Sequence, residues 1–340
     1  MSVCKMKIGK LSPEFLSELL KKFTPKDDRV VLGAKLGEDA ALIDFGDSYL
    51  VATSDPITFS SDYIGWYVVQ INANDIAAMG AIPRWFIATL LLPEDSTESI
   101  INNLFNQLAE ACDELNISLI GGHTEITHGI ERPIVSGTML GLVEKGKVVF
   151  TSGALPGDSI ILTKQIAIEG TSIVAREFGS KLLDTGVDPK VISKARNLLF
   201  DPGISVVEEA ILACESVKVH SMHDPTEGGI ATGLSELATA AGIGLLINRE
   251  EIPILSECKQ FCDLLGIDPL GMLSSGSLLI TVASGDGRKL IDVFKHNGIS
   301  ASEIGTCTAT SEGIKLITDG CSSPLPIFEK DELARYISSI

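Results

Sequence analysis

Apolar positions along the chain change repeatedly between the period of an amphipathic helix and the alternation of a half-buried strand, which predicts a mixed α and β protein. In the first half, helices are expected near residues 13–23, 64–79 and 97–115. Strands are expected near residues 40–43, 49–53, 85–92 and 117–120, and within residues 133–149. Because these strands do not alternate regularly with helices, we expect antiparallel or mixed sheets.

The densest turn signal in the middle of the chain is the run SGALPGD at residues 152–158, where we place a domain boundary. The predicted domains are residues 1–152 and 153–340, and 340 residues suffice for about two domains. The second domain is expected to open with a strand at 159–163 and to be mostly helical through residue 214. Later strands are expected at 219–222, 243–247 and 278–283, and helices between 229 and 241, at 288–296 and after 328.

The composition, 45% hydrophobic and 21% charged, is that of a globular protein. Its 27 basic and 45 acidic residues give a net charge of −18, which argues against nucleic acid as a partner. No apolar run is long enough to cross a membrane, and residues 1–10 are too polar for a signal peptide, so we expect a soluble, cytoplasmic protein. Seven scattered cysteines without a CxxC pair favour reduced thiols over disulfides or zinc.

Three aspartates are candidates for metal chemistry. Asp39 precedes one predicted strand and Asp55 follows the next, although each alone is also compatible with an ordinary turn. Asp75 lies inside the predicted helix 64–79, on the face of Asn72, with apolar neighbours on every side. A buried carboxylate is costly unless it is hydrogen-bonded, paired or bound to metal, so we interpret Asp75 as a ligand. If the three converge, they require a hard cation such as Mg²⁺, as phosphoryl transfer from ATP does.

Two glycine pairs are candidate anion sites. Gly121 and Gly122 follow a predicted strand and allow backbone amides to approach an anion, and His123 after them is either a phosphate contact or acid–base group, or a solvated turn residue. Gly228 and Gly229 precede a predicted helix whose N-terminus exposes amides, with close helix packing as the alternative reading. The chain has no P-loop, kinase, GxGxxG or GxSxG motif, so an ATP enzyme here requires another fold.

Five segments, in order and spacing, resemble the AIR synthase (PurM) superfamily across nearly the whole chain: 37–41 (GEDAA), 54–55 (SD), 74–81 (NDIAAMGA), 121–124 (GGHT) and 224–229 (DPTEGG). The superfamily includes aminoimidazole ribonucleotide synthetase, selenophosphate synthetase, thiamine-monophosphate kinase and the hydrogenase maturation protein HypE. Segments 224–229 and 265–270 (LGIDPL) are most similar to HypE. Residues 64–66 followed by Asn74 and Asp75 resemble thiamine-monophosphate kinase.

The resemblance implies an α+β, PurM-like two-domain fold: an N-terminal α+β domain whose sheet pairs with its twin in a homodimer, and a C-terminal α/β domain. It implies ATP in the cleft between them, magnesium on Asp39, Asp55 and Asp75, and catalytic roles for Asp75 and His123. The nucleotide contacts it implies are Asp39, Asp55, Asn74, Gly121, Gly122, Thr124, Gly228 and Gly229. HypE-like chemistry phosphorylates a carboxamide oxygen with ATP and eliminates it, forming a thiocyanate for a nickel–iron hydrogenase.

Two departures separate this sequence from HypE, which carries its substrate on a C-terminal cysteine and has aspartate at the position of His123. The last cysteine here is Cys321, and the sequence closes on Ser338-Ser339-Ile340. Our first hypothesis is a HypE-like ATP-dependent enzyme or a paralogue, with a hydrogenase-maturation protein as a partner. The alternatives are a small-molecule kinase resembling thiamine-monophosphate kinase and a nucleotide-binding maturation scaffold without turnover. The three aspartates argue against the scaffold, because a scaffold needs no metal cluster.

Overall fold

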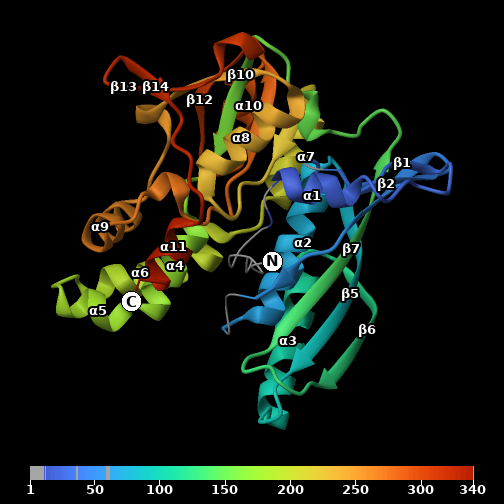
Figure 1. The fold of residues 1–340 in the computed structure, drawn as a ribbon, viewed down its shortest axis with the longest axis vertical. Helices are drawn as coiled ribbons and strands as arrows, with labels where there is room; N and C mark the ends of the chain where they lie inside the picture. The colour runs from blue at the N-terminus through green and yellow to red at the C-terminus, as the bar shows by residue number, and fades with distance from the viewer. Residues whose placement is uncertain (1–10, 12, 36, 59–61, 340) are drawn as a thin grey trace, which may run out of the picture.

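The computed structural model describes residues 11–339 except residues 12, 36 and 59–61, and it contains two sheets, each with its own helices (Figure 1). The prediction about residues 1–10 lies outside the described residues. In spatial order the first sheet runs β1 (Val30–Leu32), β2 (Ala41–Phe45), β3 (Ser48–Thr53), β7 (Ile134–Glu144), β5 (Ile82–Leu92) and β6 (Ser118–Ile126), with β4 (Pro56–Ile57) also paired to β7. The β5–β6 pair is parallel and the others are antiparallel, which confirms the expected mixed sheet.

Helix α2 (Ile64–Ala78) packs on one face of this sheet, and α3 (Glu98–Glu114) packs against α2. All fifteen residues of α2 are buried, as expected for a helix that is apolar on every side. Gly141 on β7 permits the close approach, because a Cβ at this position would lie 2.3 Å from Cγ2 of Ile76. The short helix α1 (Pro13–Leu20) precedes the sheet.

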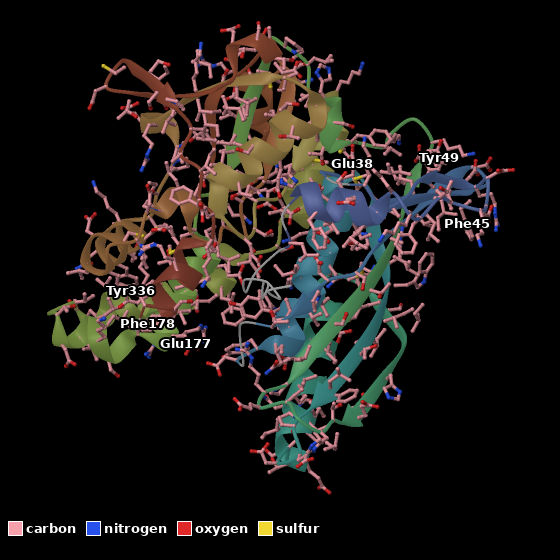
Figure 2. The ribbon with its side chains drawn as sticks, in the orientation of Figure 1. Glu38, Phe45, Tyr49, Glu177, Phe178 and Tyr336 are labelled. Carbon is pink, nitrogen blue, oxygen red and sulfur yellow. The ribbon has the colours of Figure 1, made fainter. Side chains whose placement is uncertain are left out.

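The second sheet has the order β14 (Cys321–Pro324), β13 (Ile314–Thr318), β10 (Gly244–Asn248), β12 (Ala301–Thr308), β8 (Asp158–Thr163), β11 (Leu279–Ala283) and β9 (Val219–His223). Its helices are α4 (Ile168–Glu177), α5 (Gly179–Asp184), α6 (Pro189–Asn197), α7 (Val207–Ser216), α8 (Gly229–Ala241), α9 (Ser256–Leu265), α10 (Gly287–His296) and α11 (Glu332–Ile337). Helices α4, α5, α6 and α9 form a lobe to one side (Figure 1), where Figure 2 shows Phe178 beside Tyr336 of α11, with their ring centroids 5.2 Å apart.

The change from one sheet to the other takes place between Glu144 and Asp158, through the single turn η1 (Thr151–Gly153). The predicted boundary after residue 152 falls inside this connection. Together the two sheets with their helices form the α+β, two-domain fold that the resemblance implies. Among the described helices, none combines the length and apolar character needed to cross a membrane.

Several elements differ from the sequence predictions. The strand expected at 117–120 continues as β6 through Ile126, because Gly121 to Ile126 pair with β5 along their whole length. Every residue of β6 is exposed, so this edge strand carries no apolar alternation that the sequence could reveal. The short strands β12, β13 and β14 and the helix α9 were not predicted either. Backbone pairing positions these late strands: β12 pairs with β10 and β8, β13 pairs with β10, and β14 pairs with β13.

Candidate metal and nucleotide site between the domains

The three predicted aspartates come together with a fourth, Asp224, which follows β9 in the second domain. Burial raises the pKa of Asp75 well above its usual value, and the charges of Asp224, Asp55 and Asp39 raise it further. Burial likewise raises the pKa of Asp224, with added contributions from Asp39 and Asp55. Asp75 and Asp224 are 8% and 4% exposed. Asp75 and Asp224 are therefore buried, Asp39 and Asp55 are half-buried, and the four carboxylates form one mutually repelling cluster.

Hydroxyl groups supply part of the polar environment of this cluster. The Thr53 hydroxyl donates to Asp75 Oδ2 over 2.8 Å and lies 3.2 Å from the carbonyl oxygen of Asp39. The Thr151 hydroxyl lies 3.2 Å from Asp39 Oδ2 and from the carbonyl oxygen of Met222. Thr53 closes β3 and Thr151 opens η1, so the site is built where the first sheet ends and the second domain begins.

His223 is the cationic member of the site. Its Nδ1 lies 3.0 Å from Asp39 Oδ1 and its Nε2 lies 3.0 Å from Glu236 Oε2. Burial by itself lowers the pKa of His223, but Asp39 and Glu236 outweigh that effect and raise the pKa well above the usual value. With a carboxylate at each nitrogen the imidazole donates on both sides and carries a positive charge. His223 therefore anchors Asp39 from the second domain.

The donor set fits a hard divalent cation. A carboxylate oxygen of Asp39 and one of Asp224 lie within 4.8 Å of each other and of a ring nitrogen of His223, which as an imidazolium is not itself a ligand. The Asp224 Oδ2 atom is buried and has no hydrogen-bond partner among the described residues. Four carboxylates against one imidazolium leave an excess of buried negative charge, and a magnesium ion takes such oxygen ligands. Asp39, Asp55, Asp75 and Asp224 are the residues that would hold it.

Two asparagines of α2 bond backbone groups near the site through their side-chain amides. The Asn72 Oδ1 accepts from the Asp55 backbone N–H over 2.9 Å, and its Nδ2 donates to the Asp55 carbonyl over 3.1 Å. Asn74, predicted to contact the nucleotide, is fully buried and donates to the Ile204 carbonyl while accepting from the Val206 N–H, both at 2.9 Å. Its amide therefore joins α2 to the second domain instead of lining the carboxylate cluster.

Glu38 makes a second link of this kind. Its carboxylate accepts from the backbone N–H groups of Thr151 and Ser152, at 3.1 and 3.4 Å. Figure 2 shows Glu38 where the first domain meets the second, near α1 and α8. The loop that carries Asp39 is thus tied to the connection between the domains, which fixes Asp39 relative to His223.

His123 lies elsewhere, on the exposed edge strand β6, with its Nε2 3.0 Å from Glu125 Oε2. A line of paired residues crosses the sheet from His123 on β6 to Thr89 on β5, then to Ser136 on β7. It ends at Pro56 on β4, which is next to Asp55. Three strand spacings place His123 about 14 Å from Pro56. The ligands of one magnesium ion lie within about 4 Å of one another, so His123 does not share an ion with Asp55 in the same chain.

Three of the other predicted nucleotide contacts, Gly122, Gly228 and Gly229, have local structural tasks. Gly121, Gly122 and Thr124 also lie on β6, and Gly122, at φ 152°, approaches β5 so closely that a Cβ would lie 2.0 Å from the Ala88 carbonyl oxygen. The Gly228 N–H at the start of α8 donates to Asp331 Oδ2 over 2.9 Å, so this amide already has a carboxylate partner. A Cβ on Gly229 would lie 2.5 Å from the Leu270 carbonyl oxygen, in agreement with the helix-packing alternative.

Sequence reasoning missed Asp224 and His223 as members of the site. Asp224 opens the segment 224–229 and, like Asp55, comes two residues after the end of a predicted strand. That parallel was the available signal. His223 had none, because its partners Asp39 and Glu236 lie 184 and 13 residues away.

Comparison with known proteins identifies the family. Residues 37–143 match the N-terminal domain, and residues 156–317 the C-terminal domain, of the AIR synthase related proteins. The chain belongs to this family. The resemblance drawn from the five segments is thereby confirmed, and this AIR synthase related protein has relatives of known name along nearly its full length.

A hydrogenase expression/formation protein of Methanocaldococcus jannaschii is 28% identical over 318 residues, which cover 91% of both chains. The carbamoyl dehydratase HypE of Cupriavidus necator is 27% identical, and the match covers 76% of this chain and 71% of the relative. Two solved structures share the fold. A HypE–HypF complex matches with a TM-score of 0.72 and 23% identity, and the match covers 94% of this chain and 99% of that chain. A HypE bound to ATP matches with a TM-score of 0.70 and 22% identity, and the match covers 96% of this chain and 97% of that chain.

Proposed function

We propose that this AIR synthase related protein is an ATP-dependent enzyme that transfers a phosphoryl group to an amide-type oxygen, which then leaves as phosphate. The observation that carries this proposal is the cluster of Asp39, Asp55, Asp75 and Asp224, in which Asp75 and Asp224 are buried and Asp224 has the unpartnered oxygen. Such a cluster requires a cation, and phosphoryl transfer uses a cation to offset charge on the phosphates. The relatives named as hydrogenase maturation proteins support the amide-type acceptor, and the HypE solved with ATP supports the nucleotide.

Magnesium held by the four aspartates is the cofactor we propose, and it would supply charge neutralisation at the phosphates. The remaining residues of the chain position this centre. Thr53 orients Asp75 through its hydroxyl, and the His223 cation holds Asp39 from the opposite domain. Because both His223 nitrogens already donate to carboxylates, His223 orients Asp39 and does not act as a general base.

We propose that the acceptor group arrives on another molecule. Cys321 lies on β14 and is in register with Thr318 of β13, so this cysteine is fixed in a hairpin and is not presented on a tail. A maturation protein is the partner we propose, supported by the solved HypE–HypF complex of the same fold. The six described cysteines are free thiols, which supports the predicted cytoplasmic location.

We further propose a homodimer through the face of the first sheet that α2 leaves uncovered. On this face the half-exposed Trp85, Leu140 and Leu142 alternate with buried residues that face α2, and Ile82 beside them is 43% exposed. An apolar face of this kind is self-complementary in a two-fold dimer. Light scattering should give twice the 36.1 kDa chain mass, and Leu142→Lys should give the monomer mass.

The central test is calorimetry of ATP binding with and without magnesium, in the wild type and in Asp75→Asn. We expect magnesium to strengthen ATP binding in the wild type and Asp75→Asn to weaken the magnesium-dependent binding at least a hundredfold. Asp113→Asn is the matched control, because Asp113 is an exposed aspartate of α3 outside the cluster. ATP binding that is indifferent to magnesium and to Asp75 would refute the proposal.

A second experiment identifies the acceptor and separates enzyme from scaffold. ADP release is followed with a carbamoylated cysteine peptide and, separately, with thiamine monophosphate. Release of ADP with the peptide supports the proposed dehydration, and release with thiamine monophosphate alone would show the small-molecule kinase instead. Tight magnesium-dependent ATP binding without ADP release from either acceptor would favour the scaffold.

A further inference from the structure

Glu236 on α8 reaches the carboxylate cluster through His223. Its Oε2 lies 3.0 Å from Nε2 of His223, and on the other side of the ring Nδ1 lies 3.0 Å from Oδ1 of Asp39. The side chains of His223 and Asp39 are 8% and 11% exposed, whereas that of Glu236 is 38% exposed. The three side chains therefore form a line from the surface of the second domain to a candidate ligand in the first domain.

The two carboxylates determine how the ring of His223 is oriented. An ionised carboxylate only accepts hydrogen bonds, so each ring nitrogen donates to the carboxylate beside it. Without Glu236, the Nε2–H group would lose its acceptor, and a buried donor without an acceptor is costly. The ring would then gain by turning toward another acceptor, and Nδ1 would move away from Asp39. Glu236 therefore keeps the ring in the orientation that serves Asp39.

Asp39 depends on His223 for its position. It precedes β2, so strand pairing does not fix its side chain. The Thr151 hydroxyl also lies 3.2 Å from Asp39 Oδ2, but it is equally close to the Met222 carbonyl oxygen. A hydroxyl has one proton to donate, so Thr151 divides it between two acceptors. His223 is therefore the stronger of these two donors to Asp39.

Helix α8 is a firm base for Glu236 (Figure 1). The helix packs against η1 in the connection between the domains. A loop of the first domain packs on the same helix, since a Cβ on Gly37, at φ 80°, would lie 3.0 Å from the Cβ of Ala240. Ala240 is about one turn beyond Glu236. The helix thus contacts the loop that leads to the ligand and also carries the group that orients His223.

We propose that Glu236 is a positioning residue for the magnesium site: it fixes the imidazole of His223, which in turn holds Asp39 toward the ion. Side chains behind metal ligands act in this way, because they orient the ligand and limit its movement. The identity of the ion rests on the proposed function. The new element is that a half-exposed glutamate of one domain controls the affinity of a ligand in the other.

The first test is calorimetry of magnesium in the presence of ATP. We expect Glu236→Ala to weaken magnesium binding about tenfold, as the loss of such a partner typically does. Glu236→Gln should stay within about twofold of the wild type, because its amide oxygen still accepts from Nε2 although the charge is gone. Glu208→Ala, which removes an exposed glutamate of α7, is the matched control and should leave the affinity unchanged.

The second test uses the metal-free protein in EDTA and records the ring N–H protons of isotope-labelled histidine by NMR. Both ring protons of His223 are held by carboxylates, so they should exchange slowly with water, and His223→Gln identifies their signals. Glu236→Ala should remove the Nε2–H signal and shift the Nδ1–H signal, whereas Glu236→Gln should retain both. A glutamate that only stabilised α8 would leave these signals in place when it is replaced.

Three results would overturn the proposal: unchanged magnesium affinity in Glu236→Ala, equal losses in Glu236→Ala and Glu236→Gln, or unaltered His223 signals in Glu236→Ala. Failure of the proposed function has a different signature. Wild-type ATP binding would then be indifferent to magnesium, while the His223 signals would still respond to Glu236→Ala. If the role of Glu236 alone is wrong, the wild type keeps its magnesium dependence and Glu236→Ala shares it.

Discussion

The carboxylates between the domains and those around Gly228 are buried or half-buried in both places, yet they are accommodated in different ways. Between the domains, Asp39, Asp55, Asp75 and Asp224 face one another. Around Gly228, Asp331 accepts from the backbone N–H groups of Gly228 and Leu333, each at 2.9 Å. Burial still raises the pKa of Asp331 to about 6, although these amides oppose the rise.

Glu169 belongs to the second group of carboxylates, near Asp331 and Glu227. Burial raises its pKa to about 7, a hydrogen bond with Ser275 lowers it in part, and the charges of Asp331 and Glu227 add to the rise. Its Oε2 lacks a partner, as the Oδ2 of Asp224 does. A single buried acid of this kind can keep its proton near neutral pH. The unpartnered oxygen therefore indicates a cation only where several carboxylates converge, as they do between the domains.

The largest expected effect separates these two groups. Asp224→Asn should lower magnesium-dependent ATP affinity at least a hundredfold and raise the stability of the metal-free protein, because the amide removes a buried negative charge beside Asp39. Calorimetry measures the first effect, and urea unfolding in EDTA the second. Glu169→Gln is the control, since it also removes a carboxylate with an unpartnered oxygen but should leave ATP affinity unchanged. An Asp224→Asn protein with wild-type ATP affinity would exclude Asp224 as a ligand.

The second prediction concerns pH. The pKa of Glu169 is about 7 in the folded protein and 4.5 in its ordinary state, so the folded protein holds this proton more tightly than the unfolded chain does. This stabilisation is present below pH 4.5 and is lost as the pH rises through 7, by up to about 3 kcal/mol.

Glu169→Gln should remove this loss, so that the variant is more stable than the wild type at pH 8 and close to it at pH 5. Urea midpoints at the two pH values measure the effect. Glu208→Gln, which replaces an exposed glutamate of α7, is the matched control and should follow the wild type. Parallel pH profiles for the wild type and Glu169→Gln would contradict the assignment.

The smallest effect is expected at Thr53. Its hydroxyl donates to Asp75 and lowers the pKa of that carboxyl against the effect of burial. Thr53→Val should therefore weaken magnesium binding by about 1 kcal/mol, roughly fivefold. Calorimetry of magnesium in the presence of ATP measures this change, with Thr89→Val on β5 as the control. An unchanged magnesium affinity would show that Asp75 needs no orientation by Thr53.

Much of the fold was predictable because apolar periodicity survives in most elements. The helix expected at 64–79 is α2, and the strands expected at 85–92 and 159–163 are β5 and β8. The edge strand β6 could not be predicted to its full length, since it is exposed on both faces and is defined by pairing with β5. The strands β12 and β13 were missed for a related reason, because pairings with distant segments define them, and β14 follows from its hairpin with β13.

The site was predictable only in part. Asp39, Asp55 and Asp75 each lie at a strand end or in an apolar helix, and the structure brings them together. The position of Asp224 among them depends on how the second domain packs, which local patterns do not encode. Asn74 illustrates the opposite case, because the family resemblance implied a nucleotide contact there, whereas its amide bonds the backbone of residues 204 and 206.

The complete burial of α2 has a consequence for how the molecule unfolds. The helix packs against the first sheet and α3, and also against α7 and β9 of the second domain. If the second domain melted first, α2 would expose apolar surface to water, and Asn74 would lose both of its backbone partners. We therefore expect the two domains to unfold in one cooperative transition.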